Sequence, residues 1–339
     1  MTAAAALHPD RDRRAAGGRW AESLARLYPV PAPHRAEDVD RRTALEMLRC
    51  GPAVLDRLVA DGLPHSDGED GPRFDRHDLV NLALQSGSGA TMPERAVLFA
   101  LRWMREDPRT WTEPLEWTYD ISMSCPDCTG GTFRHSLLLP ERHGGTVLEQ
   151  SADPAPSIQD GDLVWRGPAR FAGRLRTRGE LFELRAPELR RITRDFLDAG
   201  YRWARLPKQV QADYRAVMAA GVAPCVTATM FLEREYRAAG FPAVGRSGWI
   251  LGMLDLAHAW VEVVDDDGVT KVVDPALERL SVHAGSPHPD LGRYALGSRS
   301  NRMLPTSAPA GQPQARHACA GSPLQPATTR TIIRRAGAR

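Results

Sequence analysis

Lysine, aromatic residues and long apolar runs are all scarce in this chain. Only Lys208 and Lys271 are lysines among the 44 basic residues, and aromatic residues make up 6% of the 339 positions. The formal net charge is +2, so composition alone favours no polyanionic partner. No apolar run approaches the roughly 18 residues that a transmembrane helix needs, so we expect no membrane span.

The sequence also shows no secretory signal and no disulfide framework. Residues 1–18 contain four alanines followed by charges, without the basic start and long apolar stretch of a signal peptide. The five cysteines are odd in number and irregularly spaced, which argues against a set of structural disulfides. These features predict a cytoplasmic protein, and the length predicts two domains or three.

The clearest chemical signal lies in residues 221–280, which present a cysteine, a histidine and an aspartate in that order. Pro224 precedes Cys225, apolar and charged residues then follow with helical spacing over 226–239, and Gly240 comes next. This pattern predicts a helix that begins at Cys225. A helix N-terminus favours the thiolate form of a cysteine, and the thiolate is the nucleophile.

The segment after this helix has the pattern of a β-hairpin. Residues 257–264 alternate and are rich in aromatic and β-branched side chains, residues 265–268 supply a turn, and residues 270–273 form a second short strand. His258 and Asp274 can then lie side by side, with Asp274 fixing the imidazole tautomer and the other ring nitrogen facing the cysteine. A thiol, an imidazole and a carboxylate so arranged are the parts of a cysteine-nucleophile triad.

In its motifs this segment resembles the catalytic core of the transglutaminase-like superfamily, a circularly rearranged papain-like fold. The matching pieces are Cys225 after a small-residue turn, GFPAVGRSG after the helix, HAWVEV in the next strand and VDPA at the end of the hairpin. The resemblance covers about residues 186–298. It implies that Cys225 is the nucleophile, His258 the general base and then acid, and Asp274 the orienting carboxylate.

The same resemblance implies an upstream polar side chain that helps the Cys225 backbone N–H to bind an oxyanion, and Gln209 and Gln211 are the candidates. Trp260, beside the histidine, is the candidate for a substrate contact. The chain departs from the family at 270–272, where Thr-Lys-Val stands and many members have a tryptophan. No calcium-loop pattern is present, so we expect no cofactor.

Each triad residue also has an ordinary structural interpretation. Free cysteine is among the most buried residue types, and a histidine beside a tryptophan is often half-buried and hydrogen-bonded. The catalytic interpretation therefore depends on Cys225, His258 and Asp274 occurring together, in order and on the expected elements. A catalytically inactive relative with the same fold is the main alternative.

A second cysteine pattern lies in residues 116–185, where short strand-like runs are separated by Gly, Pro and Asp. Cys125 and Cys128 form a C-x-x-C pair, which is half of a zinc site, a redox pair or two ordinary loop cysteines. A structural zinc needs four ligands, and the spacing of His135 and His143 fits no familiar zinc finger. A redox pair usually opens a helix, whereas Thr-Gly-Gly follows here. We therefore assign no metal and keep this pair as a weak zinc candidate.

Residues 1–39 have no periodicity and predict a flexible arm with one short helix around Trp20–Tyr28. Residues 40–115 predict helix, turn, helix, a wing-like turn and further helices, an order that resembles a winged helix-turn-helix module. Residues 35–80 carry seven arginines and eleven acidic residues, a net charge of about −4. A DNA-binding module should present a basic face, so the charge of this module argues against a nucleic-acid partner. A peptide, a carrier protein or simple packing on the catalytic domain fits this module better.

Residues 299–339 contain seven arginines and no acidic residue, with much Pro, Ser, Ala and Gly. This composition predicts a disordered basic tail. The predicted fold class is α+β, with a cysteine-bearing helix packed on an antiparallel sheet that bears the histidine and the aspartate. The helical module and the β-rich segment precede this domain.

The predicted reaction is acyl transfer through a thioester acyl-enzyme on Cys225. The acceptor is an amine or water, and the donor is a thioester, a peptide or another amide. The N-terminal half is absent from a minimal peptidase, which favours an acyltransferase that forms an amide on a small-molecule or carrier-bound substrate, as in natural-product pathways. One alternative is a cysteine peptidase or amidase with the same triad. Another is a non-enzymatic DNA- or protein-binding regulator with a vestigial triad.

Overall fold

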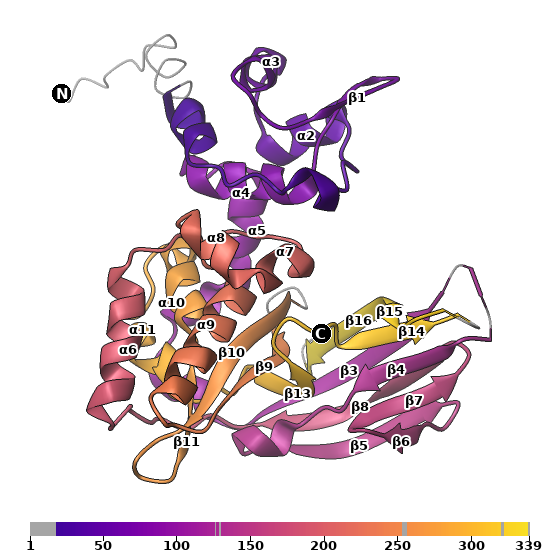
Figure 1. Ribbon diagram of the computed structural model, residues 1–339, viewed down its shortest axis with the longest axis vertical. Helices are drawn as coiled ribbons and strands as arrows, with labels where there is room; N and C mark the ends of the chain where they lie inside the picture. The colour runs from indigo at the N-terminus through magenta and orange to yellow at the C-terminus, as the bar shows by residue number, and fades with distance from the viewer. Residues whose placement is uncertain (1–17, 126, 129, 253–255, 320–321, 338–339) are drawn as a thin grey trace, which may run out of the picture. The chain divides into compact units, whose positions relative to one another are not determined.

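The structure, a computed structural model, describes residues 18–125, 127–128, 130–252, 256–319 and 322–337. The chain divides into two compact units, Met1–Leu101 with Ala204–Val210 and Arg102–Trp203 with Gln211–Arg339 (Figure 1). The β-rich segment and the catalytic segment, which the sequence suggests as separate domains, therefore belong to one unit. Within the described residues, no helix combines the length and the apolarity needed to span a bilayer.

The first unit is helical, with one small hairpin. Its elements are a helical segment at 18–25, η1 (Ala32–His34), α2 (Arg41–Leu48), α3 (Pro52–Ala60), β1 (Ser66–Gly68), β2 (Gly71–Arg73), α4 (Arg76–Ser86) and α5 (Met92–Ala100). Asp40, Asp75 and Thr91 cap the N-termini of α2, α4 and α5 with their side chains. The antiparallel pair β1–β2 stands where the wing-like turn is predicted. The winged-helix resemblance itself stays a prediction.

The prediction of a flexible arm over residues 1–39 is wrong for its described part. Residues 1–17 lie outside the described residues, but Val30 and Val39 are fully buried. Val39 also pairs with Phe74 in an isolated β-bridge, with hydrogen bonds of 3.1 and 2.8 Å between their backbones. Isolated apolar residues anchor this extended segment, and such anchors give no periodic signal in the sequence.

The first unit also ends before the predicted boundary at residue 115. Residues 102–111 carry Trp103 and Trp111, both buried in the second unit. The ring of Trp111 lies 4.9 Å from that of Tyr294, edge to face. Burial of these large rings holds the segment to the second unit.

One half of the second unit consists of two β-sheets that share a core. The first sheet has the order β16-β3-β8-β5 and the second the order β15-β14-β4-β7-β6. Their strands are β3 (Leu115–Ser124), β4 (Thr132–Ser136), β5 (Thr146–Asp153), β6 (Ser157–Gln159), β7 (Asp162–Arg166), β8 (Ala169–Thr177), β14 (Ala315–Ala318), β15 (Gln325–Pro326) and β16 (Thr328–Arg335). Buried side chains alternate along β3 and meet those of β4 and β7 in one cluster with Phe133 and Trp165. Strands β3 to β8 lie within or beside the predicted β-rich segment 116–185.

The prediction of a disordered tail over residues 299–339 is wrong for the described residues. Strands β13 (Met303–Pro309), β14 and β16 pair with β9, β4 and β3, so the tail completes three sheets. In β16 only Ile333 is buried, while the arginines face solvent. The partner strand supplies the backbone hydrogen bonds of such a strand, so a polar composition does not prevent it from forming.

The other half of the second unit is a sheet with helices. The sheet has the order β12-β11-β10-β9-β13, with β9 (Ala243–Ile250), β10 (Leu256–Val264), β11 (Thr270–Val273) and β12 (Leu296–Gly297). The helices are α6 (Pro187–Asp198), α8 (Tyr214–Ala219), α9 (Cys225–Ala238), α10 (Pro275–Leu280) and α11 (Leu291–Ala295). Helix α7 (Lys208–Ala212) begins in the first unit and ends in the second. The short 3-10 helices are η2 (Arg102–Arg105), η3 (Pro108–Trp111), η4 (Pro140–His143) and η5 (Ser281–Ala284). Helices α6 and α9 pack their apolar sides against β10 and β11 in one buried cluster.

This half agrees with the predicted α+β class. The predicted helix over 226–239 is α9, and the predicted hairpin is the antiparallel pair β10–β11, in register at Val261 and Val273. The turn between these strands closes with a hydrogen bond from Gly268 N–H to Asp265 at 2.9 Å. The elements that bear the cysteine, the histidine and the aspartate are thus helix α9, strand β10 and the end of strand β11.

Candidate active site

Helix α9 presents Cys225 at its first position. Pro224 before it is extended, with φ −67° and ψ 174°, so the helix cannot continue upstream. The backbone N–H groups of the first turn have no acceptor within the helix, and the N-terminal end of the helix dipole favours negative charge. The thiol is half-buried. An anion is therefore favoured at this end of the helix, and the position of Cys225 agrees with the sequence prediction.

His258 and Asp274 form a buried, hydrogen-bonded pair. Nε2 of His258 lies 2.6 Å from Oδ2 of Asp274, and the two side chains are 2% and 1% exposed. Asp274 follows β11 directly and caps α10, because its Oδ1 accepts a hydrogen bond from the Leu277 N–H at 2.9 Å. Both carboxylate oxygens are therefore used, one by the imidazole and one by the helix.

The second ring nitrogen of His258, Nδ1, is available to interact with Cys225. Nε2 is held by Asp274, and Cys225 is close enough to influence the imidazole electrostatically, so Nδ1 is the ring nitrogen that is left for the thiol. Burial alone would lower the pKa of His258, but the charges of Asp274 and Cys225 and the hydrogen bonds to both raise it to about 10. The ring is therefore an imidazolium near neutral pH, and an imidazolium beside a cysteine stabilises the thiolate.

Of the two glutamines named from the sequence, Gln211 lies beside the thiol. Its Oε1 accepts a hydrogen bond from the Val226 N–H at 3.2 Å and lies 3.7 Å from Sγ of Cys225. Its backbone carbonyl accepts a hydrogen bond from the Thr227 hydroxyl at 2.8 Å, which fixes α7 against the first turn of α9. Gln209 is exposed on the same short helix.

The assignment of Trp260 as a substrate contact is wrong, because the side chain is fully buried. Its ring stacks beside that of His258, with centroids 6.2 Å apart. Gly248 stands opposite His258 on β9, and a Cβ there would lie 2.4 Å from the Trp260 ring. A glycine at this position therefore leaves room for the indole, and Trp260 supports the imidazole from within the core.

Glu262 continues this buried row on β10 and was not predicted as a site residue from the sequence. Its carboxylate binds Arg246 at 3.2 Å and His143 at 3.2 Å. Alternate residues of a strand lie on one face, so the spacing of His258, Trp260 and Glu262 was a readable signal for a buried polar row. The row ends in this buried ion pair.

Lys271 occupies the region where the superfamily commonly has a tryptophan. Its side chain is 2% exposed, with Nζ 2.8 Å from Oδ2 of Asp267 and 5.0 Å from the centroid of the Phe182 ring. The departure from the family pattern is therefore accommodated by a buried ion pair within the hairpin.

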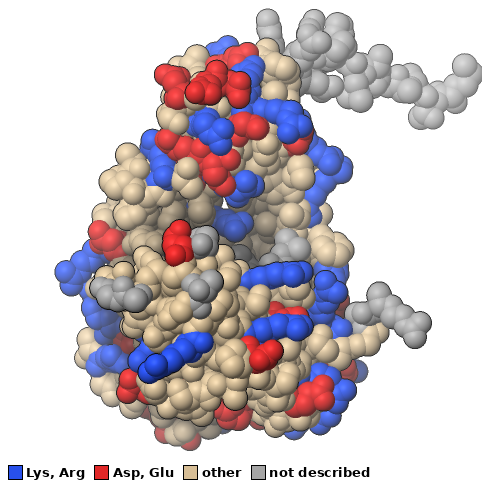
Figure 2. Space-filling model, turned by 90° about the vertical axis from the view of Figure 1, so that its right-hand side faces the viewer, with Lys and Arg blue, Asp and Glu red and all other residues tan. Residues whose placement is uncertain are grey.

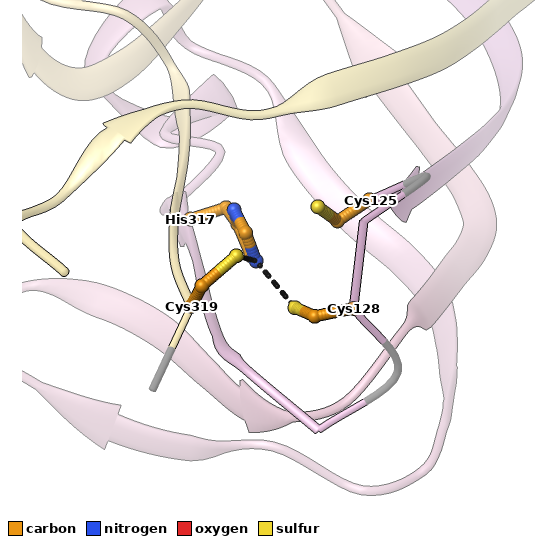
Figure 3. A group of neighbouring side chains, drawn as sticks. All are labelled: Cys125, Cys128, His317 and Cys319. Carbon is orange, nitrogen blue, oxygen red and sulfur yellow. Dashed lines mark hydrogen bonds between the residues drawn. The ribbon is translucent and has the colours of Figure 1, made fainter. Parts of the chain in front are cut away.

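In the structure the C-x-x-C pair lies beside two further residues that were not predicted from the sequence. Cys125 and Cys128 lie with His317 and Cys319 in a group whose ligand atoms all fall within 4.8 Å of one another (Figure 3). The two histidines first considered lie elsewhere, since His135 donates from Nδ1 to the Ser136 carbonyl at 2.7 Å and His143 binds Glu262. The missed signal is the H-x-C motif at residues 317–319, within the segment predicted to be disordered.

No protein-family model matches this chain, and no curated protein matches it. Among solved structures, the chain is similar to a protein from Cytophaga hutchinsonii that is provisionally assigned as a cysteine protease. The TM-score is 0.40 and the identity 12%, over 67% of this chain and 93% of that chain. A similarity of this size shows neither a shared fold nor a shared activity.

Proposed function

We propose that this chain is an acyl-transfer enzyme of the transglutaminase-like kind, with Cys225 as nucleophile, His258 as proton carrier and Asp274 as orienting carboxylate. One observation carries the proposal. It is the buried contact of 2.6 Å between Nε2 of His258 and Asp274. This contact leaves Nδ1 of the imidazole for Cys225, which is half-buried at the N-terminus of α9. A merely structural histidine has no need of a charged partner on one side and a thiol on the other.

The reaction follows from these positions. The Cys225 thiolate attacks the carbonyl carbon of a thioester or amide, forming an S–C bond and an oxyanion. The C–S or C–N bond to the leaving group then breaks as the His258 imidazolium gives that group its proton. An amine or a water next attacks the acyl-enzyme, the neutral imidazole takes its proton, and the product leaves with Cys225 again a thiolate.

We propose two groups that bind the oxyanion. The N–H of Cys225 is the first of helix α9, and the side-chain amide of Gln211 lies beside Sγ. Oε1 of Gln211 already accepts from the Val226 N–H, so the donors that this side chain could offer to an oxyanion are its amide N–H groups. We infer that they donate to the oxyanion as it forms.

Replacing Gln211 by alanine is therefore expected to lower kcat about 100-fold, the typical cost of one oxyanion donor. The exposed Gln209 on the same helix offers a matched control, and Gln209→Ala should leave kcat and KM unchanged. Steady-state kinetics on the two variants make the comparison, with circular dichroism to check the fold. Equal kcat values in the two variants would remove Gln211 from the mechanism.

For the acceptor, we propose an amine rather than water, so that the product is an amide made on a small-molecule or carrier-bound substrate. The support is the first unit, an additional folded module that the triad chemistry does not require. Peptidase or amidase activity with the same triad is the alternative. The regulator with a vestigial triad lacks support, because the imidazole and the carboxylate remain in hydrogen-bond contact.

Product analysis separates these functions. A panel of acyl thioesters is incubated with the enzyme, with and without a primary amine, and the products are identified by mass spectrometry. We expect the amide to exceed the free acid at least tenfold when the amine is present. Free acid alone would identify a hydrolase, and acyl products from Cys225→Ala at the wild-type rate would exclude the triad altogether.

The charges of the first unit support a protein or peptide partner rather than nucleic acid. On α3, the helix that a winged module would use for recognition, Arg57 pairs with Asp61 at 3.4 Å and Asp56 pairs with Arg41. Acidic and basic side chains are interspersed on the face drawn in Figure 2 rather than separated into a basic stripe. We propose a carrier protein or a peptide as the partner of this unit.

A further inference from the structure

The strongest unassigned feature is the group formed by Cys125, Cys128, His317 and Cys319, which the acyl-transfer reaction does not use. Cys125 directly follows β3, and Cys128 lies in the connection to β4. His317 is on β14, and Cys319 follows the end of that strand. Figure 3 shows the four side chains turned toward one another. They come from chain segments almost 200 residues apart, brought together because β14 pairs with β4.

The spacing of the ligand atoms fits a tetrahedral metal ion. Nε2 of His317 lies 3.1 Å from Sγ of Cys128 and 3.6 Å from Sγ of Cys319, and all four ligand atoms fall within 4.8 Å. Zinc–sulfur and zinc–nitrogen bonds of about 2.3 and 2.0 Å imply ligand atoms roughly 3.6 to 3.8 Å apart in a tetrahedron. Small side-chain rotations would therefore bring the four atoms to one ion.

The surroundings are arranged for close approach of these ligands. The His317 ring is 2% exposed and packs on Phe133, with centroids 4.5 Å apart. A Cβ at Gly131 would lie 2.5 Å from the Ala318 carbonyl oxygen, 2.7 Å from Nε2 of His317 and 3.0 Å from Sγ of Cys128. A side chain at this position would thus displace two ligand atoms, whereas the neighbouring Gly130 has open space around it.

We propose that Cys125, Cys128, His317 and Cys319 form a structural zinc site. Three thiolates and one imidazole suit zinc, and four protein ligands close the coordination sphere, which is typical of structural rather than catalytic zinc. Binding displaces the thiol protons to solvent, one for each cysteine that ligates. The ion needs no oxidant or reductant.

The site joins both sheets of the β-rich half. Cys125 directly follows β3 of the sheet β16-β3-β8-β5. His317 lies on β14 of the sheet β15-β14-β4-β7-β6. The ion would therefore fasten the C-terminal strands to the strands near Cys128, at the end of the sandwich where two chain connections meet. Metal binding at this place would stabilise the pairing of C-terminal strands that bury few apolar side chains.

The metal content of the untagged full-length protein, measured by plasma mass spectrometry after gel filtration, tests the proposal. About one zinc per chain is expected in the wild type and in Cys50→Ser, which changes a cysteine of the first unit. Less than about one tenth of that is expected in Cys128→Ser. Cobalt, exchanged into the chelated wild-type protein, should give the absorption of a tetrahedral thiolate complex, and this readout does not depend on any variant folding.

The adjacent glycines provide a second comparison. Gly131→Ala is expected to weaken zinc binding at least tenfold in a chelator competition, and Gly130→Ala to leave it unchanged. The proposal is overturned if reduced wild-type protein binds no zinc on titration, if Cys128→Ser keeps the wild-type zinc content, or if peptide mapping finds a Cys125–Cys128 disulfide in the purified protein. None of these readouts involves turnover, so they are independent of the proposed acyl transfer.

Discussion

Replacing Cys225 by alanine is expected to lower kcat by several orders of magnitude while leaving the fold and the zinc content unchanged. The alanine removes only the atom that bonds to the acyl group, since the helix N-terminus and the His258–Asp274 pair do not depend on Sγ for their position. Turnover of the thioester substrate in the product assay measures the loss. Cys50→Ala, at a half-buried cysteine of the first unit, is the matched control and should retain full activity.

The same thiol is expected to react with iodoacetamide at least tenfold faster than Cys50 between about pH 5 and 9. The His258 pKa of about 10 keeps the imidazolium charged over this range, and an imidazolium beside a cysteine stabilises the reactive thiolate. Burial raises the pKa of Cys50, so Cys50 stays a thiol. In His258→Ala the lead should be lost. A Cys225 that is accessible but reacts no faster than Cys50 at pH 6 would refute the proposed mechanism.

Local patterns were sufficient to predict the triad elements. Helix α9 begins at Cys225 because a proline precedes it and helical spacing follows, and both signals lie within a few residues. The hairpin that holds His258 and Asp274 has alternation and a turn of three aspartates and a glycine. In each case the residues that decide the element are neighbours in the sequence, and the structure agrees with the prediction.

Where the decisive contacts are distant in sequence, the predictions failed. The strands of the tail are held by β3, β4 and β9, and nothing in their own composition reveals those partners. The same pairing places His317 against Cys128, 189 positions away. The burial of Trp260 depends on a glycine of the neighbouring strand, Gly248. Each of these failures is a failure to foresee which strands pair, not a misjudged property of the residues themselves.

The second large effect on activity is expected on substitution of Asp274, because each of its two carboxylate oxygens accepts a different hydrogen bond. Oδ2 accepts from Nε2 of His258 and Oδ1 accepts from the Leu277 N–H. An asparagine has one acceptor oxygen. If a substituted asparagine keeps the helix cap, its NH2 group faces Nε2 and forces the ring proton onto Nδ1, so the imidazolium is lost. If it keeps the imidazole, a donor faces the Leu277 N–H and the cap is lost, at a cost of about 1 kcal/mol.

Asp274→Asn is therefore expected to lower kcat by roughly 1,000- to 10,000-fold, comparable to the loss of the correct tautomer in a serine triad. It should also raise the pH at which rapid Cys225 alkylation begins, because the charge that raises the His258 pKa is gone and a less stable imidazolium supports the thiolate less. Asp40→Asn is the matched control, since Asp40 only caps α2 by accepting from the Thr43 N–H at 2.7 Å, and asparagine caps a helix equally well. If Asp274→Asn stays within tenfold of the wild-type kcat with an unchanged alkylation profile, the carboxylate does not orient the imidazole. Trp260 and the contact to Cys225 would then have to hold the ring by themselves.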